Sequence, residues 1–309
     1  MSAINISRET SNVILDKELS SEIIAKAIDE SAFMKLAPRM EIAGAGKKFQ
    51  TITGDPVPEW TAETGSKPVG TFSFGKKEVQ AYKMALIVPF SDEFLRDKTA
   101  LYNEVIARVP KLFSRKFDAT LMSATAPGQH FDVFGGATKA SILPEAASGS
   151  NPAIDVYDRF LAVDSAIGAA DGIMNGIALA PQGRSIVLGA KDGNGYPLFS
   201  AGVGSGTVGS ILGAGVQVSK GVYVAGDADT PAVVGIAGDF DNCAWGAVND
   251  ITASISNEAT ISYTDENNEE ITLNLWQRDM FAVRFVIELA FMIRDINTFV
   301  LLTGNTPSA

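Results

Sequence analysis

The sequence predicts an α+β fold, in which helices and strands follow one another along a chain of 309 residues. Three observations lead to this class. Apolar residues recur at helical spacing near residues 20–38, 101–123 and 153–172, they alternate at strand spacing between 251 and 287, and glycines gather between 189 and 246. Because 46% of the residues are hydrophobic, the chain can bury a core without disulfides or metals.

The charge and the residue counts exclude several classes of protein. With 25 basic and 36 acidic residues, the net charge is −11, which argues against a protein that binds nucleic acid by neutralising phosphates. A single cysteine, Cys243, and a single histidine, His130, allow neither an internal disulfide nor a multi-histidine metal site. Charged side chains interrupt the most apolar stretch, Met280–Leu302, so we predict no membrane span. The first residues lack a secretory pattern, and we expect synthesis in a reducing cytosol.

The first 80 residues are predicted to form a short helix and then a long hairpin. Ser20-Ser21-Glu22 is a helix cap before an amphipathic stretch that ends near Pro38. Residues 49–53 have strand character. Residues 54–80 are rich in Pro, Gly and Thr with isolated aromatic side chains, so they cannot build a core of their own. Since an isolated hairpin is marginal in water, we expect this one to lie on a neighbouring face or on another subunit.

A buried strand and a long helix are predicted next. Residues 83–90 form the strand, and Ser91-Asp92-Glu93 begins a helix whose apolar stripe runs from about Leu101 to Ser123. Pro110 lies inside this stripe and predicts a kink or a break. Another face of the helix carries a basic row, Arg108, Lys111 and Arg115. Two interpretations of this row stay open: contact with a polyanion, and a solvated or interface-paired helix face.

The second half of the chain is predicted to mix helices with short strands. Residues 124–152 are small and turn-forming, which is typical of a surface connection. A helix at 156–167, a strand at 177–180 and a helix beginning at Pro181 follow. Further strands are predicted at 222–225, 232–237, 244–248 and 251–261, then a hairpin from the last of these to 271–276, and finally a long strand through 281–287.

No motif has the sequence context that catalysis or cofactor binding requires. Gly204-Ser-Gly206-Thr-Val-Gly209 matches a dinucleotide-binding pattern, but no clear strand or helix flanks it, and we interpret it as a loop. The fragment 192–194 lacks the other ligands of a calcium loop, and the acidic run 265–270 is interpreted as a solvated hairpin tip. Neither His130 nor Ser205 belongs to a nucleophile elbow, and Cys243 is interpreted as a small buried hydrophobe. We therefore expect no catalytic residue, no cofactor and no metal site.

The order of elements resembles the major capsid proteins of tailed bacteriophages with the Hong Kong 97-type fold. Residues 87–97 (IVPFSDEFLRD) look like the segment that leaves the family's extended loop and enters its spine helix. Residues 191–199 (KDGNGYPLF), 211–219 (ILGAGVQVS) and 238–240 (GDF) follow in the family's order. The resemblance runs from about Leu19 to Leu302 and is carried by this collinearity.

The resemblance implies a division of the chain into five parts. They are an N-terminal arm (1–48), an extended loop (49–88), a peripheral domain with the spine helix (89–152), an axial α/β domain (153–275) and return strands to the peripheral domain (276–309). The candidate subunit-interface residues are Trp60, Lys67, Phe72 and Phe74 in the loop and Arg108, Lys111 and Arg115 on the helix. Some family members cross-link a loop lysine to an asparagine; Lys67 suits that position, but the acceptor and the catalytic carboxylate have no match here.

The function implied is that of a non-enzymatic virion protein, assembled in the bacterial cytoplasm. It would form pentamers and hexamers of an icosahedral shell that encloses double-stranded DNA without sequence-specific binding. Its other expected partners are a separate scaffolding protein, a portal and a decoration protein. The scaffolding protein is expected to be separate because no large helical segment precedes the arm. Two alternatives stay open: an encapsulin-like compartment that encloses a cargo enzyme, and a small-ligand-binding α+β enzyme with its site at residues 202–215.

Overall fold

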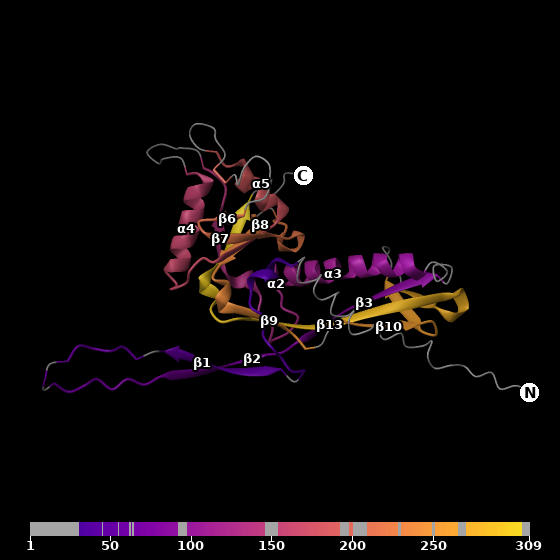
Figure 1. Cartoon of the computed structure of the whole chain (residues 1–309), viewed down its shortest axis with the longest axis horizontal. Helices are drawn as coiled ribbons and strands as arrows, with labels where there is room; N and C mark the ends of the chain where they lie inside the picture. The colour runs from indigo at the N-terminus through magenta and orange to yellow at the C-terminus, as the bar shows by residue number, and fades with distance from the viewer. Residues whose placement is uncertain are drawn as a thin grey trace, which may run out of the picture.

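The computed structural model describes residues 31–304 apart from gaps at 45, 55, 62, 64, 92–97, 146–153, 192–197, 200–208, 228–229, 249–250 and 265–269, and the statements below concern these residues. Three parts are visible in Figure 1: a two-stranded arm, an elongated sheet lined by a long helix, and a second sheet with short helices around it. The predicted helix cap at 20–22, residues 192–194, Ser205 and the hairpin tip at 265–269 lie outside the described residues.

The arm is the long hairpin expected from residues 54–80. Strands β1 (Lys47–Gly54) and β2 (Ser73–Val79) pair antiparallel, from Lys47 opposite Val79 to Ile52 opposite Phe74, with an irregularity before Gly54. Residues beyond the paired strands continue outward without regular structure. Figure 1 shows the arm projecting well away from the rest of the chain.

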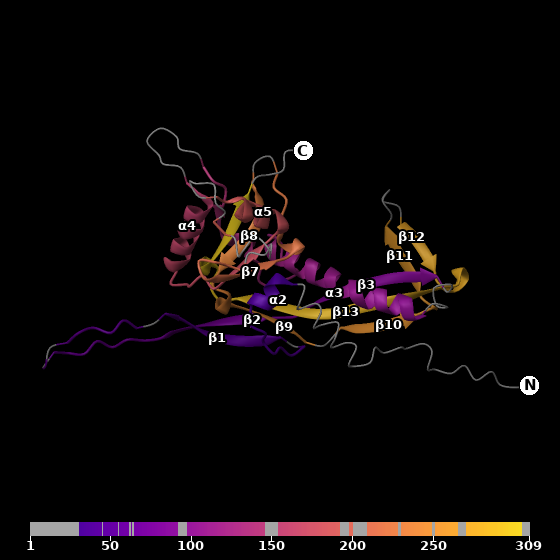
Figure 2. The ribbon, with the colours of Figure 1, turned by 45° about the horizontal axis from the view of Figure 1, so that its top comes forward.

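The elongated sheet is built around β13 (Met280–Ile293), the predicted final long strand. It pairs with β3 (Tyr82–Ser91) along one edge, and with β10 (Thr252–Ser256) and β9 (Cys243–Ala247) along the other. At the end opposite the arm, β11 (Thr260–Thr264) and β12 (Glu270–Asn274) form the predicted hairpin, which Figure 2 shows rising from the sheet.

Two expectations about this region are wrong. The strand at 83–90 is present as β3, but it is not buried: its residues alternate between half-buried and exposed, and Ile87 is 46% exposed. The reason is that β3 is an edge strand, paired on one side only by β13. The segment 251–261 is not one strand, because a turn separates β10 from β11 and each pairs with a different partner.

Helix α3 (Lys98–Met122) lies along the elongated sheet, as both views of the ribbon show (Figures 1 and 2). Its buried residues Val109, Phe113, Phe117 and Leu121 follow the predicted apolar stripe. The helix continues through Pro110, so a break there is wrong, whereas a kink stays a prediction. Proline removes one backbone donor, and the Ser114 hydroxyl donates to the Pro110 carbonyl at 2.7 Å one turn later.

The second sheet has six strands in the order β4-β14-β8-β5-β7-β6. The β14–β4 and β5–β7 pairs are parallel and the other pairs are antiparallel. The strands are β4 (Thr138–Ser141), β5 (Gly176–Leu179), β6 (Ser210–Ile211), β7 (Ala214–Val218), β8 (Ala232–Gly238) and β14 (Phe299–Gly304).

Short helices cover both faces of this sheet. Helices α4 (Val156–Gly168) and α5 (Pro181–Gly189) pack on one face, while α2 (Ala32–Leu36) and the C-terminal half of α3 pack on the other. The alternation within β5 explains this layering, because Ile177 faces the α4 side and Ala178 faces the α2 side. The proline predicted at the first helical position, Pro181, begins α5.

Three further segments differ from expectation. Residues 124–152 are more than a surface connection, because Phe131 and Phe134 enter the core and β4 joins the sheet. Residues 222–225 form the end of a 3₁₀ helix, Lys220–Val222, and an isolated bridge rather than a strand. The C-terminal strands divide between the sheets: β13 lies in the elongated sheet, whereas β14 lies inside the six-stranded sheet.

The main core sits where the two sheets, α2 and α3 meet. Phe134 is its centre, with ring centroids 5.3 Å from Phe33, 5.4 Å from Phe291 and 4.8 Å from Phe299. All four rings are fully buried. Aromatic pairs at these separations add to the free energy of burial, so this cluster fastens the elongated part of the chain to the six-stranded sheet.

Candidate assembly surface

The outer part of the arm exposes several apolar side chains. Trp60 is 105% exposed and Phe72 is 53% exposed, and Val57 and Val69 are exposed beside them. Lys67 is exposed in the same segment, whereas the side chain of Phe74 lies outside the described residues. Single exposed apolar residues are common on protein surfaces, but a group of them on a projecting hairpin is typical of an interaction site.

The root of the arm, in contrast, is fastened to the body. Val79 is buried against Ile42, Ala290 and Met292. Beside it, the Lys77 ammonium forms an ion pair with Asp132 and donates to the Ile293 carbonyl. The arm is therefore fastened to the body at its root, while its described outer residues are exposed.

The predicted basic row lies on the outer face of α3. Arg108, Lys111 and Arg115 are all exposed, while the apolar stripe of the same helix is buried. Leu112 is 52% exposed within this row, and sequence reasoning did not single it out. Because arginine is enriched at contacts between proteins, this surface is a second candidate for contacts between subunits.

A buried carboxylate joins three distant segments beneath that face, and the sequence did not reveal it. Asp118 on α3 accepts hydrogen bonds from the Ser31 hydroxyl at 2.6 Å, the Ser219 hydroxyl at 2.6 Å and the Ala32 amide at 3.2 Å. Burial raises the pKa of Asp118 to about 6, and the hydrogen bonds from Ser219 and Ser31 partly oppose that shift. Asp118 thus ties the root of the N-terminal segment and the six-stranded sheet to α3.

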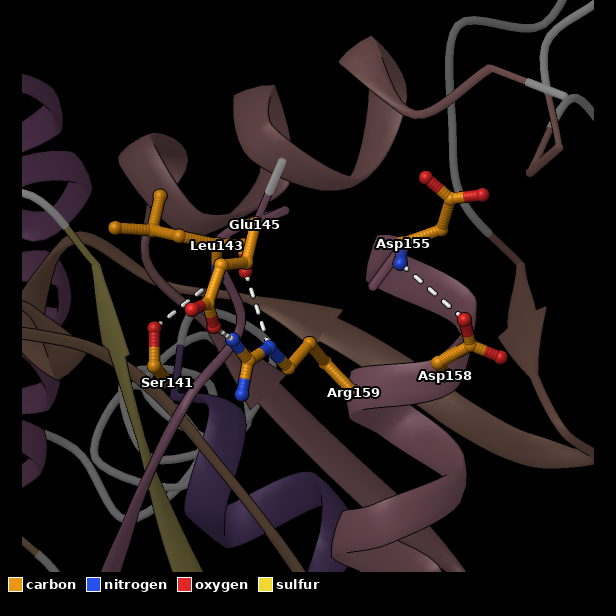
Figure 3. A network of polar contacts seen from close by, with 6 residues as sticks. All are labelled: Ser141, Leu143, Glu145, Asp155, Asp158 and Arg159. Atoms are coloured by element: carbon orange, nitrogen blue, oxygen red, sulfur yellow. Dashed lines mark hydrogen bonds and ion pairs between the residues drawn. The ribbon is translucent and has the colours of Figure 1, made fainter. Parts of the chain in front are cut away.

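A second polar network fixes the chain that enters α4. The Arg159 guanidinium donates to Glu145 Oε2 at 2.6 Å and to the Leu143 carbonyl at 3.2 Å (Figure 3). The Leu143 amide donates to the Ser141 hydroxyl, and Asp155 and Asp158 form a capping box at the start of the helix (Figure 3). These contacts hold β4 against α4 and provide no catalytic geometry.

The remaining sequence motifs have structural roles where they are described. Cys243 is buried, burial raises the pKa of its thiol, and the thiol donates to the Phe240 carbonyl at 3.3 Å. The backbone of His130 pairs with Gln80. Within the described residues, no group of three or more His, Cys, Asp or Glu side chains could hold a metal ion. In the same part of the chain, no helix is long and apolar enough to cross a membrane.

Comparison with known proteins gives matches over almost the whole chain. The model of the Phage capsid family matches residues 11–304. The probable major capsid protein gp17 of Mycobacterium phage D29 is 26% identical over 292 residues, which cover 94% of this chain and 90% of that protein.

Solved structures share the fold. A chain from Microbacterium phage Oxtober96 superposes with a TM-score of 0.68 at 21% identity, covering 89% of this chain and 91% of that chain. The capsid of the native GTA particle superposes with a TM-score of 0.60 at 14% identity, covering 91% and 90%. The mixed α+β architecture is therefore common to this chain and both structures.

Proposed function

The chain belongs to the phage capsid family and is a major capsid protein of an icosahedral phage shell, and we propose that the β1–β2 arm joins its subunits into pentamers and hexamers. As a structural component of the virion it is not an enzyme. Membership of this family decides against the two alternatives that the sequence left open, the compartment that encloses a cargo enzyme and the ligand-binding enzyme. The similar capsid of the GTA particle, computed with C5 symmetry, supports the pentamer.

The observation that carries the proposal is the exposure of aromatic side chains on the arm. Trp60 and Phe72 lie on a hairpin that has no core of its own, and a hairpin of this kind is marginal in water unless it packs on another surface. Since an adjacent subunit is present throughout a shell, we propose that the arm lies across it. Burial of each aromatic ring would then stabilise the contact by roughly 2 kcal/mol.

The basic row is proposed to pair with acidic side chains of neighbouring subunits. With a net charge of −11, every copy of the chain has more acidic than basic side chains with which the row could pair. The same charge suits a wall that encloses double-stranded DNA without binding its phosphates tightly. Reversal of the charges of Arg108, Lys111 and Arg115 together is expected to abolish shell assembly, and shells from that variant would overturn this pairing.

The test of the arm is assembly of purified subunits, with and without a scaffolding protein, followed by electron microscopy. Trp60→Ala combined with Phe72→Ala is expected to leave folded subunits that form no shells. The matched control, Trp60→Phe with Phe72→Tyr, keeps two aromatic rings at the same positions and is expected to assemble. Shells of normal yield from the double alanine variant would overturn the role of the arm.

We extend the proposal to the division of the chain and its other partners. The β1–β2 arm corresponds to the extended loop, α3 to the spine helix and the six-stranded sheet to the axial domain. A separate scaffolding protein, a portal and a decoration protein complete the expected set of partners. Co-purification of shells with each candidate protein, encoded beside this gene, tests them individually.

A further inference from the structure

We propose that Lys77 and Asp132 are positioning residues that set the direction in which the β1–β2 arm leaves the body. Through that direction they decide where the arm tip meets the adjacent subunit. The proposal rests on the proposed function of the arm, and it adds the contact that sets the direction of the arm. The contacts that carry it lie at the root of the arm, where β2 passes the end of β13.

The side chain of Lys77 bridges the arm to two separate pieces of the body. Its ammonium lies 2.6 Å from Asp132 Oδ2 and also donates to the backbone carbonyl of Ile293, at the end of β13. Asp132 is itself fixed, because its Oδ2 accepts from the Ile293 amide at 2.7 Å and its own amide donates to the Phe291 carbonyl at 3.2 Å. The lysine is therefore held by a carboxylate that cannot follow the arm if the arm swings.

The alternation of β2 places Lys77 and Val79 on the same side of the strand, toward the body. Val79 is buried at the base, next to the turn where Gly46 has a φ of 82° and lies close to the Val79 carbonyl. Lys77 is the polar contact two residues nearer the tip. Val79 and Phe49 form the apolar contact at the base, and the ion pair of Lys77 adds a directed polar contact that fixes the angle of the strand.

The opposite side of β2 provides an internal comparison. Glu78 points away from the Lys77 contacts and pairs with Lys48, its direct neighbour on β1, at 3.4 Å. That ion pair joins the two strands of the arm to each other and leaves the body untouched. Loss of Lys48 and loss of Lys77 therefore remove one lysine each from the same hairpin, but only the second removes a contact between the arm and the body.

The length of the arm makes the angle at its root important. The chain between Lys77 and Thr61 spans about 50 Å when extended, at roughly 3.3 Å per residue. A rotation of about 10° at the root would move the tip by about 9 Å, whereas apolar side chains must approach within about 1 Å of surface contact to pack. We call the contact of Lys77 with Asp132 and the Ile293 carbonyl the joint. Without this joint, the arm would reach the adjacent subunit in many positions, most of which would not allow packing.

The first experiment measures the direction of the arm in the unassembled full-length subunit. Spin labels are attached at Ser66→Cys in the arm and at Ser165→Cys on α4, and pulsed electron paramagnetic resonance measures the distance between the two labels. The buried Cys243 stays unlabelled. Lys77→Met is expected to broaden the distance distribution at least twofold. Lys77→Arg, which keeps the charge and the donors, and Lys48→Met are expected to retain the narrow distribution. An unchanged distribution in Lys77→Met would overturn the proposal.

The second experiment asks whether the joint matters for assembly. Lys77→Met is expected to lower the yield of closed shells at least tenfold or to give particles of mixed diameter, while Lys48→Met assembles normally. If the distribution broadens but shells form normally, the joint is correct and its role in aiming the arm is overturned. If Trp60→Ala with Phe72→Ala also assembles normally while Lys77→Met broadens the distribution, it is the proposed function of the arm that fails.

Discussion

The arm and the core use aromatic residues in opposite ways. Phe33, Phe134 and Phe291 are fully buried within one chain, whereas Trp60 and Phe72 are exposed on the arm. The contacts of the core form during folding of the subunit, whereas the contacts that we propose for the arm need a second copy of the chain. On this proposal, the core supplies free energy of folding and the arm supplies free energy of assembly.

The first prediction tests the core, where the largest loss of stability is expected. Phe291 contacts the rings of Phe33, Phe117, Phe131 and Phe134. Phe291→Ala removes these contacts and leaves a cavity, so we expect it to lower the free energy of unfolding by about 4 kcal/mol. Urea unfolding of the unassembled subunit measures the change. A loss below about 1 kcal/mol would show that the cluster is not the fastening point of the subunit.

The second prediction concerns the buried carboxylate beneath α3. Asp118→Ala leaves the hydroxyls of Ser31 and Ser219 and the Ala32 amide without their acceptor. We expect a loss of about 3 kcal/mol, because each unsatisfied buried group costs roughly 1–3 kcal/mol. Asp118→Asn keeps an acceptor oxygen and serves as the control in the same urea titration. Equal losses in the two variants would mean that the hydrogen bonds do not carry the effect.

The third prediction is a pH dependence from the same residue. Burial raises the pKa of Asp118 from its ordinary value of 3.8 to about 6 in the folded subunit, so the folded state binds this proton more tightly. Its contribution to stability is therefore largest below about pH 4 and is lost as the pH rises to about 6, by at most about 3 kcal/mol. The difference in stability between the wild type and Asp118→Asn is expected to shift in favour of Asn over that interval. A difference independent of pH would contradict the assignment.

The fourth prediction tests the arm and has the smallest effect on folding. Trp60→Ala is expected to change the free energy of unfolding of the unassembled subunit by less than about 0.5 kcal/mol, because the side chain is fully exposed. The contrast with Phe291→Ala is the measure of how far the two regions differ. A loss above about 1 kcal/mol would mean that the arm packs on its own body in solution, and limited proteolysis of the arm would then show protection.

Local periodicity was enough to predict much of the fold. The stripe from Val109 to Leu121 predicted the buried face of α3, and the Pro, Gly and Thr composition of 54–80 predicted a hairpin without a core. Such patterns succeed because helix faces and strand alternation depend on residues only two to four positions apart. The composition of the same segment drew attention to Trp60 and Phe72 as candidate interface residues, because isolated aromatic residues stand out in a polar segment.

The exposure of β3 and the division of 251–261 could not be predicted in the same way. The edge position of β3 depends on which strand pairs with β13, and the split between β10 and β11 depends on two different partner strands. Apolar composition alone does not distinguish an edge strand from a central one. The core role of Phe131 and Phe134 was missed because their segment is rich in small residues, which hides two isolated aromatic side chains.

The sequence by itself determined the α+β class, the long α3 helix, the projecting hairpin and the acidic, cysteine-poor character of the chain. Only the tertiary structure decided which side chains join the parts. Asp118 meets Ser31 across 87 residues and Ser219 across 101, and Lys77 meets Ile293 across 216. No local pattern encodes contacts at such separations, because they exist only after the sheets have packed and brought these segments to one place.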